Sequence, residues 1–284
     1  MGNIINGKPV AEKITKDLIN KVNVLKSKGI VPKLTIMRVG NNGSDLAYEK
    51  GAVKRASMIG IETEIKEYHK EISENEFIEE LKKENENKNT NGILIFRPLP
   101  KQLREDKIKY VISEDKDVDC FSPFNVAKLM EGDKSGFIPC TPAAVIETLK
   151  YYNVQMSGKR AVVIGRSMVV GKPVSMLLLN ENCTVTICHS KTSDIQDITS
   201  KADILIVGIG KANMINSDYI KENAVVIDVG INVDPNGKIC GDVYTEDCVN
   251  KASMITPVPG GIGSITTSVL CKHVVEACIK QNNL

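Results

Sequence analysis

The sequence predicts an α/β protein with an N-terminal α/β domain, a Rossmann-like parallel-sheet domain and a C-terminal helix that returns to the first domain. Four short runs in the second half are apolar along their whole length, and the first three are each followed by a turn signal and a helix-like segment. Such strands, alternating with helices, are typical of a parallel sheet covered on both sides. The length of 284 residues also exceeds the usual range for a single core. The four runs are 161–164, 185–188, 204–207 and 225–227.

The first half predicts helices and strands in alternation. Apolar residues recur every three or four positions from Val10 to Leu25, which indicates a helix that Gly29 stops. Similarly local signals, such as apolar runs, capping residues and prolines, predict the later elements. They are a strand at 34–39, a helix at about 44–59 ending at Gly60, a helix opened by the capping box Ser73–Glu76, a strand at 92–96 stopped by Pro98, and a helix from the N-cap Thr141 to about Tyr152.

The domain boundaries follow from breaks in this pattern. The second half forms one alternating block, which we place at 141–258 as a nucleotide-type domain. A turn-rich break at Pro257–Gly261 precedes a last helix at 264–281. The first domain is therefore expected to contain residues 1–140, completed by residues 259–284.

Composition excludes several classes of function. Lys plus Arg is 37 and Asp plus Glu is 35, so a net charge of +2 gives no reason to expect nucleic acid or an anionic membrane as a partner. No apolar run approaches the roughly 20 residues of a membrane span, and the polar start is unlike a signal peptide. We expect a soluble, cytoplasmic protein.

The eight cysteines predict neither a zinc site nor a disulfide framework. None forms a C-x-x-C pair, and the chain has only three histidines, so no metal site is expected. Several cysteines lie in apolar stretches, where they are expected to be small buried hydrophobic residues.

A glycine-containing turn after the strand at 161–164 predicts a dinucleotide site. Gly165 allows a tight turn, and Gly171 allows close backbone approach where the next helix begins and its free N–H groups favour phosphate. Arg166 and Ser167 lie in this turn. The pattern differs from G-x-G-x-x-G, so alone it also fits a plain strand-to-helix turn.

The end of the next strand favours NADP over NAD. NAD-binding folds of this type place an Asp or Glu there for the ribose hydroxyls, whereas this strand ends with His189, Ser190 and Lys191. Arg166, Ser190 and Lys191 offer donors and positive charge that suit the 2′-phosphate of NADP. An ordinary exposed lysine would also explain Lys191.

Five motifs resemble the bacterial methylenetetrahydrofolate dehydrogenase/cyclohydrolase family, and the matches are colinear over essentially the whole chain. The terminal proline-glycine run is the most specific of them. The motifs are Lys116-Asp117-Val118-Asp119, Pro139-Cys140-Thr141-Pro142, the run 165–173, Gly241-Asp242-Val243 and the run 256–263.

The resemblance implies a homodimer with two α/β domains around a cleft that binds tetrahydrofolate and NADP. The family's reactions are oxidation of 5,10-methylene- to 5,10-methenyltetrahydrofolate and hydrolysis of that product to 10-formyltetrahydrofolate. The implied catalytic residues are Tyr48, which contacts the pterin and aminobenzoyl region, and Asp119, which accepts hydrogen bonds from the pterin. The resemblance also implies folate contacts by Pro259, Gly260 and Gly261, and a cofactor contact by Ile231.

Three positions depart from the family pattern. The family's Tyr-x-x-x-Lys places the tyrosine at Tyr48 and the lysine at Ala52. The family's Gln-Leu-Pro-Leu-Pro reads Phe96-Arg97-Pro98-Leu99-Pro100, so the glutamine that pairs with the lysine is replaced by Phe96. The family's Asp-Gly reads Asp119-Cys120, and the usual serine three residues before the tyrosine is Asp45.

These departures predict a dehydrogenase with little or no cyclohydrolase activity. Hydride transfer mainly needs two ligands held in position, whereas hydrolysis needs general acid–base work for which the family lysine is implied. Lys50 or Lys54 could replace that lysine if the helix were distorted at Gly51, which would give a conventional bifunctional enzyme. A folate- and NADP-binding regulatory protein without turnover, or a dehydrogenase for an unrelated acid, are further alternatives.

Overall fold

The computed structural model describes residues 2–284 and divides the chain into two compact units, each with its own parallel sheet. The six-stranded unit combines the chain up to Glu12 with Thr141–Thr266, and the three-stranded unit combines Lys13–Cys140 with Thr267–Leu284. The predicted α/β class is confirmed. The observed division differs from the expected boundaries at two places, because the first residues and the segment 259–266 lie in the six-stranded unit.

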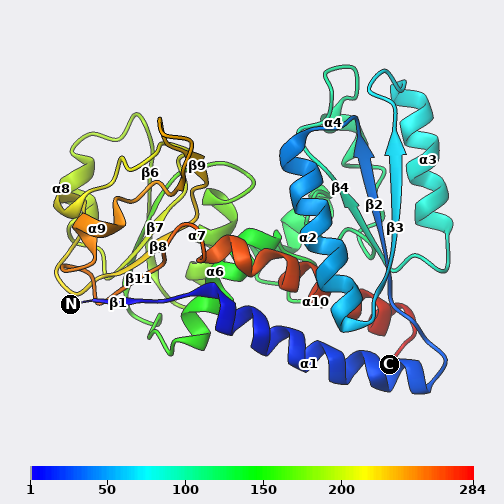
Figure 1. The fold of residues 1–284 in the computed structure, drawn as a ribbon, viewed down its shortest axis with the longest axis horizontal. Coiled ribbons are helices and arrows are strands. Elements are labelled where there is room, and N and C mark those ends of the chain that lie inside the picture. The colour runs from blue at the N-terminus through cyan, green and yellow to red at the C-terminus, as the bar shows by residue number, and fades with distance from the viewer. Residues whose placement is uncertain (1) are drawn as a thin grey trace. The chain divides into compact units, whose positions relative to one another are not determined.

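The sheet of the six-stranded unit has the order β1-β11-β8-β7-β5-β6, and all its neighbouring strands run parallel (Figure 1). Strand β1 pairs with β11, which explains why the start of the chain belongs to this unit. The strands are β1 (Asn3–Ile4), β5 (Arg160–Ile164), β6 (Thr184–Cys188), β7 (Ile204–Val207), β8 (Val225–Asp228) and β11 (Met254–Ile255).

Helices and one small hairpin complete this unit. Of the strands at the four apolar runs, β5 and β6 are followed by α-helices, and the helix after β6 has just five residues. Strand β7 leads into a loop and a 3-10 helix, so the helix-like segment predicted after the run 204–207 is wrong. The elements are α6 (Cys140–Tyr151), α7 (Gly171–Asn180), α8 (Ile195–Thr199), α9 (Thr245–Cys248), η1 (Ser217–Tyr219), η2 (Ile262–Ser264), β9 (Asn232–Val233) and β10 (Ile239–Cys240). The buried core is aliphatic, as the low aromatic content requires.

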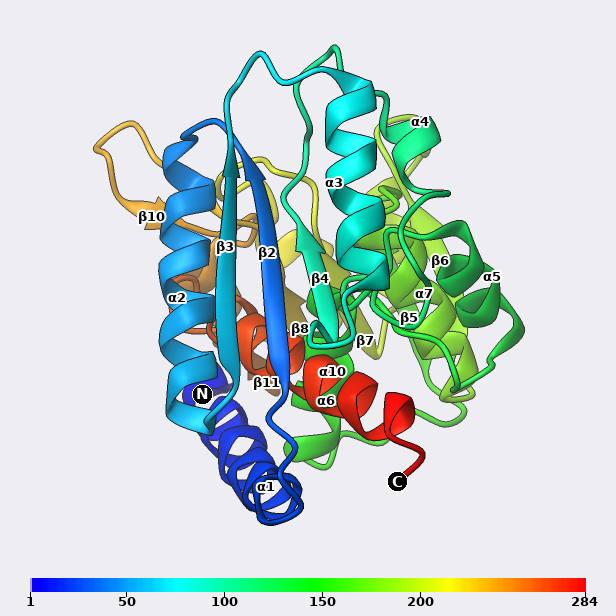
Figure 2. The same cartoon turned by 90° about the vertical axis from the view of Figure 1, so that its right-hand side faces the viewer.

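The three-stranded unit contains a parallel sheet with the order β3-β2-β4, whose strands lie side by side in Figure 2. Phe77 and Leu81, from the helix Glu74–Glu86 that follows β3, pack on Ile93 and Ile95 of β4 and form the core of this unit with them. The elements are β2 (Lys33–Val39), α2 (Gly43–Ile59), β3 (Glu62–Tyr68), α3 (Glu74–Glu86), β4 (Gly92–Ile95), α4 (Glu105–Ile108), α5 (Pro123–Glu131) and α10 (Thr266–Gln281). Helix α1 (Gly7–Ser27) begins in the six-stranded unit and belongs to this unit from Lys13 onward.

Local signals explain most element ends. The Ser73 hydroxyl accepts the N–H of Glu76 at 3.2 Å, as the capping box predicts, and Gly60 ends α2 at φ 91°. The predicted N-cap Thr141 is wrong, because α6 begins one residue earlier at Cys140. The N–H of Cys140 is instead accepted by the Asp119 carboxylate at 2.9 Å, a contact from distant sequence.

All eight cysteines are free thiols, and all except the partly exposed Cys240 are buried. Burial raises the pKa of the Cys248 thiol to about 12, which keeps it protonated and unreactive. Within residues 2–284, no helix is both long enough and apolar enough to cross a membrane.

Candidate active site

The turn between β5 and α7 leaves no space for side chains at its two glycines. Gly165 has φ 131°, and a Cβ there would collide with the carbonyl oxygen of Gly208, which follows β7. A Cβ at Gly171 would in turn collide with the carbonyl of Gly165. Because β6 and β7 lie on opposite sides of β5, this turn lies at the topological switch point of the sheet, where open α/β sheets bind ligands.

The positively charged residues that we expect to bind the cofactor follow the carboxyl ends of β5 and β6, at the same edge of the sheet as Gly165. Ile164 pairs in register with Cys188, so Arg166 and Ser190 each follow this pair by two residues. Arg166, Ser167, Ser190 and Lys191 are all exposed. The turn after β6 is ordered, since the backbone N–H of Lys191 donates to His189 Nδ1 at 3.1 Å. Side chains at this edge are therefore available to a bound anion.

Two buried aspartates fix the loops beside this turn, and sequence reasoning missed their role. The Asp242 carboxylate accepts the backbone N–H groups of Ile209, at 2.6 Å, and Lys211, at 2.7 Å. Asp228 accepts those of Gly230 and Val243, both at 2.8 Å. Burial raises the pKa of Asp228 to about 6 despite these donors. The loops after β7 and β8 are thus tied to one another by carboxylates.

The proline-glycine run lies in the same six-stranded unit. Gly260 has φ 102°, and its carbonyl accepts the N–H of Gly7 at 2.8 Å. A Cβ at Gly261 would collide with the carbonyl of Pro257, so this glycine is required by the turn. Exposed Ile231 also belongs to this unit.

Helix α2 of the three-stranded unit presents the Tyr48 side chain beside Phe96. The two rings are 6.0 Å apart between centroids and meet edge to face, at 83°. Ala52, one turn later, is fully buried, whereas Lys50 and Lys54 are exposed. The helix runs uninterrupted from Gly43 to Ile59, so the distortion that would bring either lysine to the Ala52 face is not observed.

A buried arginine anchors α2. Arg38 Nε donates to Glu49 Oε2 at 2.9 Å, and Arg38 Nη2 pairs with Glu67 at 3.0 Å. Arg38 Nη1 also donates to Asn41 Oδ1 at 2.6 Å and to the carbonyl of Gly40. Since Glu49 directly follows Tyr48, this pair ties the part of α2 that contains the tyrosine to β2. The sequence carried no local signal for this cluster.

The Lys116–Asp119 motif separates into structural and accessible residues. Lys116 is buried and donates to the carbonyls of Glu84 and Asn87, and buried Asp117 accepts from Phe121 and Ser122. Asp119, by contrast, keeps 31% of its side chain exposed. Within this motif, Asp119 is therefore the residue available to a ligand.

Cys120, at the position where the resemblance implies a glycine, has φ 57° and is buried. A left-handed conformation costs a non-glycine residue about 1–2 kcal/mol, which explains why glycine suits this position.

The candidate residues divide between the two units. Tyr48 and Asp119 belong to the three-stranded unit. The six-stranded unit contains the expected cofactor residues and the proline-glycine run, namely Gly165, Arg166, Ser167, Gly171, Ser190, Lys191, Ile231, Pro259, Gly260 and Gly261.

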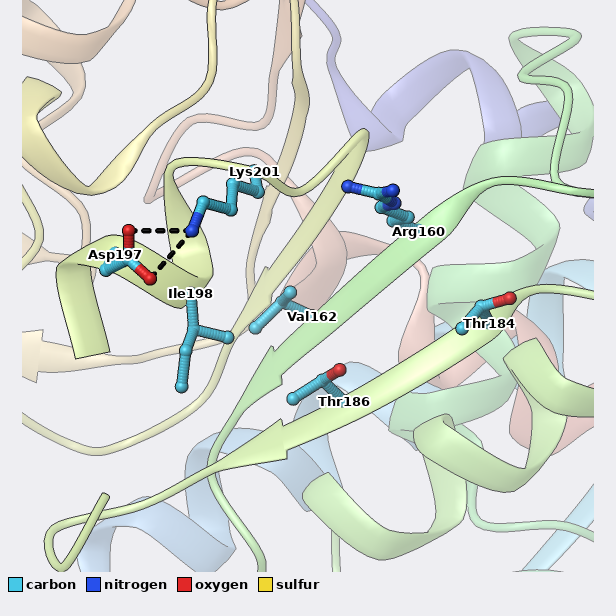
Figure 3. Close-up of a pocket in the computed structure, with 7 residues that line it drawn as sticks. All are labelled: Arg160, Val162, Thr184, Thr186, Asp197, Ile198 and Lys201. Carbon is cyan, nitrogen blue, oxygen red and sulfur yellow. Dashed lines mark hydrogen bonds and ion pairs between the residues drawn. The ribbon is translucent and has the colours of Figure 1, made fainter. Parts of the chain in front are cut away.

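A cavity of about 280 Å³ lies on the face of β5 and β6 beside α8 (Figure 3). Its lining includes Arg160 and Thr184 at the starts of the two strands, and the Lys201–Asp197 ion pair at 2.7 Å. This is the opposite end of the strands from Gly165, and no expected cofactor residue lines it. We assign it no role.

Comparison with known proteins matches almost the whole chain. Residues 5–119 match the catalytic domain of tetrahydrofolate dehydrogenase/cyclohydrolase, and residues 139–282 match its NAD(P)-binding domain. A relative from Alkaliphilus oremlandii, named bifunctional protein FolD, is 61% identical over 284 residues and covers 100% of both chains.

Comparison with solved structures agrees with these family matches. The chain matches the bifunctional FolD methylenetetrahydrofolate dehydrogenase/cyclohydrolase from Campylobacter jejuni with a TM-score of 0.97 at 40% identity, covering 100% of both chains. It matches the Trypanosoma brucei FolD complexed with NADP cofactor and inhibitor with a TM-score of 0.94 at 33% identity, covering 100% of this chain and 99% of the other.

Proposed function

The chain belongs to the tetrahydrofolate dehydrogenase/cyclohydrolase family, and from this premise we propose that it oxidises 5,10-methylenetetrahydrofolate to 5,10-methenyltetrahydrofolate in one-carbon metabolism. The three-stranded unit would bind the folate, and the six-stranded unit would bind NADP. The observation that supports this assignment most strongly is that the chain has both the glycine-containing turn at 165–171 and a partly exposed Asp119.

The cofactor preference rests on the chemistry of the turns after β5 and β6. The cradle formed at Gly165 and Gly171 fits a pyrophosphate that approaches the backbone closely. Arg166, Ser190 and Lys191 would bind the 2′-phosphate, and no carboxylate stands at the end of β6 to accept ribose hydroxyls. A family member from Trypanosoma brucei was solved with NADP, which is consistent with this preference.

In the dehydrogenase step, this chain's side chains bind and orient the substrate. Bound NADP supplies the hydride acceptor. Asp119 would accept hydrogen bonds from the pterin amino group and ring nitrogen, and Tyr48 would pack on the pterin and aminobenzoyl region. No protein base has to remove a proton from the reacting carbon, because the folate nitrogen drives hydride loss. Positioning is therefore the main contribution of the protein.

We further propose that the hydrolysis step is lost or very weak. Ala52 cannot act as an acid or base, and Phe96 occupies the position of the family's glutamine. Lys50 and Lys54 are exposed on an undistorted helix, which argues against their replacing the lysine. The name of the 61% identical relative favours the conventional bifunctional alternative. The two proposals therefore make opposite predictions about the rate at which the protein hydrolyses methenyltetrahydrofolate.

Assays of both half-reactions on the purified protein test these proposals. We expect NADPH to form from methylenetetrahydrofolate, and the methenyl product to accumulate and decay only at the solvent rate. Enzyme-dependent decay of methenyl absorbance would establish the bifunctional alternative instead. Binding of tetrahydrofolate and NADP without NADPH formation would support the regulatory protein, and absence of folate binding would support a different substrate.

We also propose a cytoplasmic homodimer without nucleic acid or membrane partners, as the resemblance and the balanced charge imply. Light scattering of the purified protein measures the oligomeric state directly. A monomeric mass would contradict this part of the proposal.

A further inference from the structure

A guanidinium stands beside Asp119 where the family pattern has a leucine. Arg97 follows Phe96 at the end of β4, and its Nη2 lies 3.6 Å from Asp119 Oδ2. The guanidinium carbon also lies 4.7 Å from the centre of the Phe121 ring. Only 24% of the Arg97 side chain is exposed. The side chain is thus confined between a carboxylate and an aromatic face.

The Asp119 carboxylate is held from two sides and still has free acceptor capacity. One oxygen, Oδ1, accepts the backbone N–H of Cys140 at 2.9 Å. The other faces Arg97 at 3.6 Å, which is an ion-pair distance longer than a direct hydrogen bond. Because an ionised carboxylate has about four acceptor sites, both oxygens can still accept donors from a ligand. Arg97 therefore restrains the carboxylate and leaves its oxygens able to accept hydrogen bonds from a ligand.

Arginine suits this place better than lysine would. Its planar group can stack on Phe121 while its edge faces Asp119, so little rotational freedom remains to be lost when a ligand binds. An ammonium group has no flat face to stack in this way. The chain thus has Ala52 where the resemblance implies a lysine, and it has a cation between Asp119 and Phe121 at position 97.

We propose that Arg97 is a positioning residue that orients Asp119 for the pterin of the folate substrate. This inference rests on the proposed function, because it needs Asp119 to contact the pterin. Arg97 acts through Asp119, so its effect appears in the binding of the folate and disappears when the Asp119 charge is removed. Neither the binding of NADP nor the chemical step depends on it.

Kinetics of Arg97→Leu, Arg97→Lys, Asp119→Asn and the Arg97→Leu/Asp119→Asn double variant test this role. Arg97→Leu is expected to raise the KM for methylenetetrahydrofolate about tenfold while kcat and the KM for NADP stay within about twofold. Arg97→Lys keeps the charge without the stacking, so its KM should rise about threefold. In the Asp119→Asn background, Arg97→Leu should change KM by less than about twofold.

Arg104→Leu is the matched control, because it removes an exposed arginine paired with Asp106 in the same unit, and it should leave every constant unchanged. An equal KM increase in both Asp119 backgrounds, or an unchanged KM in Arg97→Leu, would overturn the proposal.

Calorimetric titration with tetrahydrofolate separates this inference from the proposed function. A wild type that binds tetrahydrofolate without forming NADPH would contradict the dehydrogenase, while about tenfold weaker binding by Arg97→Leu would still support the role of Arg97. Equal binding by wild type and Arg97→Leu would overturn the inference even in an active dehydrogenase.

Discussion

The expected cofactor turn of the six-stranded unit and the Tyr48–Asp119 region of the three-stranded unit differ in what determines them, which is the backbone in the first and side chains in the second. The turn depends on backbone, since neither Gly165 nor Gly171 has room for a Cβ. The other region depends on side chains, and α2 and β4 form with Ala52 and Phe96 at the positions where the resemblance implies a lysine and a glutamine. Side-chain chemistry can therefore change within a retained fold, whereas a backbone cradle cannot change without moving its neighbours.

The largest effect is expected from adding one methyl group to the cofactor turn. Gly165→Ala should destabilise the protein by about 3 kcal/mol and abolish NADP-dependent activity, because φ 131° and the Gly208 carbonyl both oppose a Cβ. Thermal unfolding and NADPH formation measure these effects. Gly158→Ala is the control, since Gly158 has φ 76° but open space around it, and it should cost only about 1 kcal/mol. Equal losses of stability and activity in both variants would show that the turn does not depend on the space around the Gly165 backbone.

The next largest effect concerns Asp119, which we propose binds the pterin. Asp119→Ala and Asp119→Asn should each lower kcat/KM for methylenetetrahydrofolate about 100-fold, since hydrogen bonds to a charged group contribute about 1.5–3 kcal/mol. NADP binding should remain unchanged, because Asp119 lies in the other unit. Asn keeps an acceptor for the N–H of Cys140, so only the Ala variant should also unfold at lower temperature. Normal activity in both variants would make Asp119 a purely structural residue.

A smaller effect is expected at the exposed edge of the cofactor turn. Arg166→Ala should weaken NADP binding about 10- to 100-fold and leave NAD binding nearly unchanged, because one charge-assisted contact to phosphate is lost. Titrations of both cofactors measure this difference. Lys201→Ala, which removes an exposed cation at the opposite end of the strands, should affect neither. Equal losses for both cofactors would contradict the assignment of Arg166.

The smallest effect is expected from introducing the lysine and glutamine that the family resemblance implies at positions 52 and 96. Ala52→Lys alone should give little hydrolysis, because a lysine at this fully buried position lacks a partner and has a lowered pKa. Ala52→Lys with Phe96→Gln should raise methenyltetrahydrofolate decay about tenfold, more than the single changes combined. Hydrolysis already present in the wild type would break the comparison, and Lys50→Ala and Lys54→Ala would then identify its source.

The sequence predicted elements whose determinants are local. The Ser73 cap, the stop at Gly60 and the turn at Gly165 each depend on a few neighbouring residues, and all three are observed. Strand β3 was missed because its sequence ETEIKEY is largely polar, and its apolar pattern is too weak to indicate a strand. It forms through pairing with β2, which is not a local property.

The same reasoning applies to the candidate sites. Motifs predicted Asp119 and the turn at 165–171 as site residues. The contacts of Arg38 with Glu49 and of Arg97 with Asp119 join separate segments of the chain, so no local pattern could predict them. Residues 79–91 form a highly polar stretch, yet Glu84 within it is buried and pairs with Lys66 at 2.5 Å. A charge balanced by a distant partner leaves no trace in a linear pattern.

The buried carboxylate of Asp228 couples folding to the uptake of a proton. Burial raises its pKa in the folded protein to about 6, from the ordinary 3.8, so between these values the folded state binds the proton more tightly than the unfolded chain does. Its contribution to stability is complete below pH 3.8 and declines as the pH rises through about 6, by about 3 kcal/mol in total. The loops beside the cofactor turn are thus held by a group whose charge opposes folding at neutral pH.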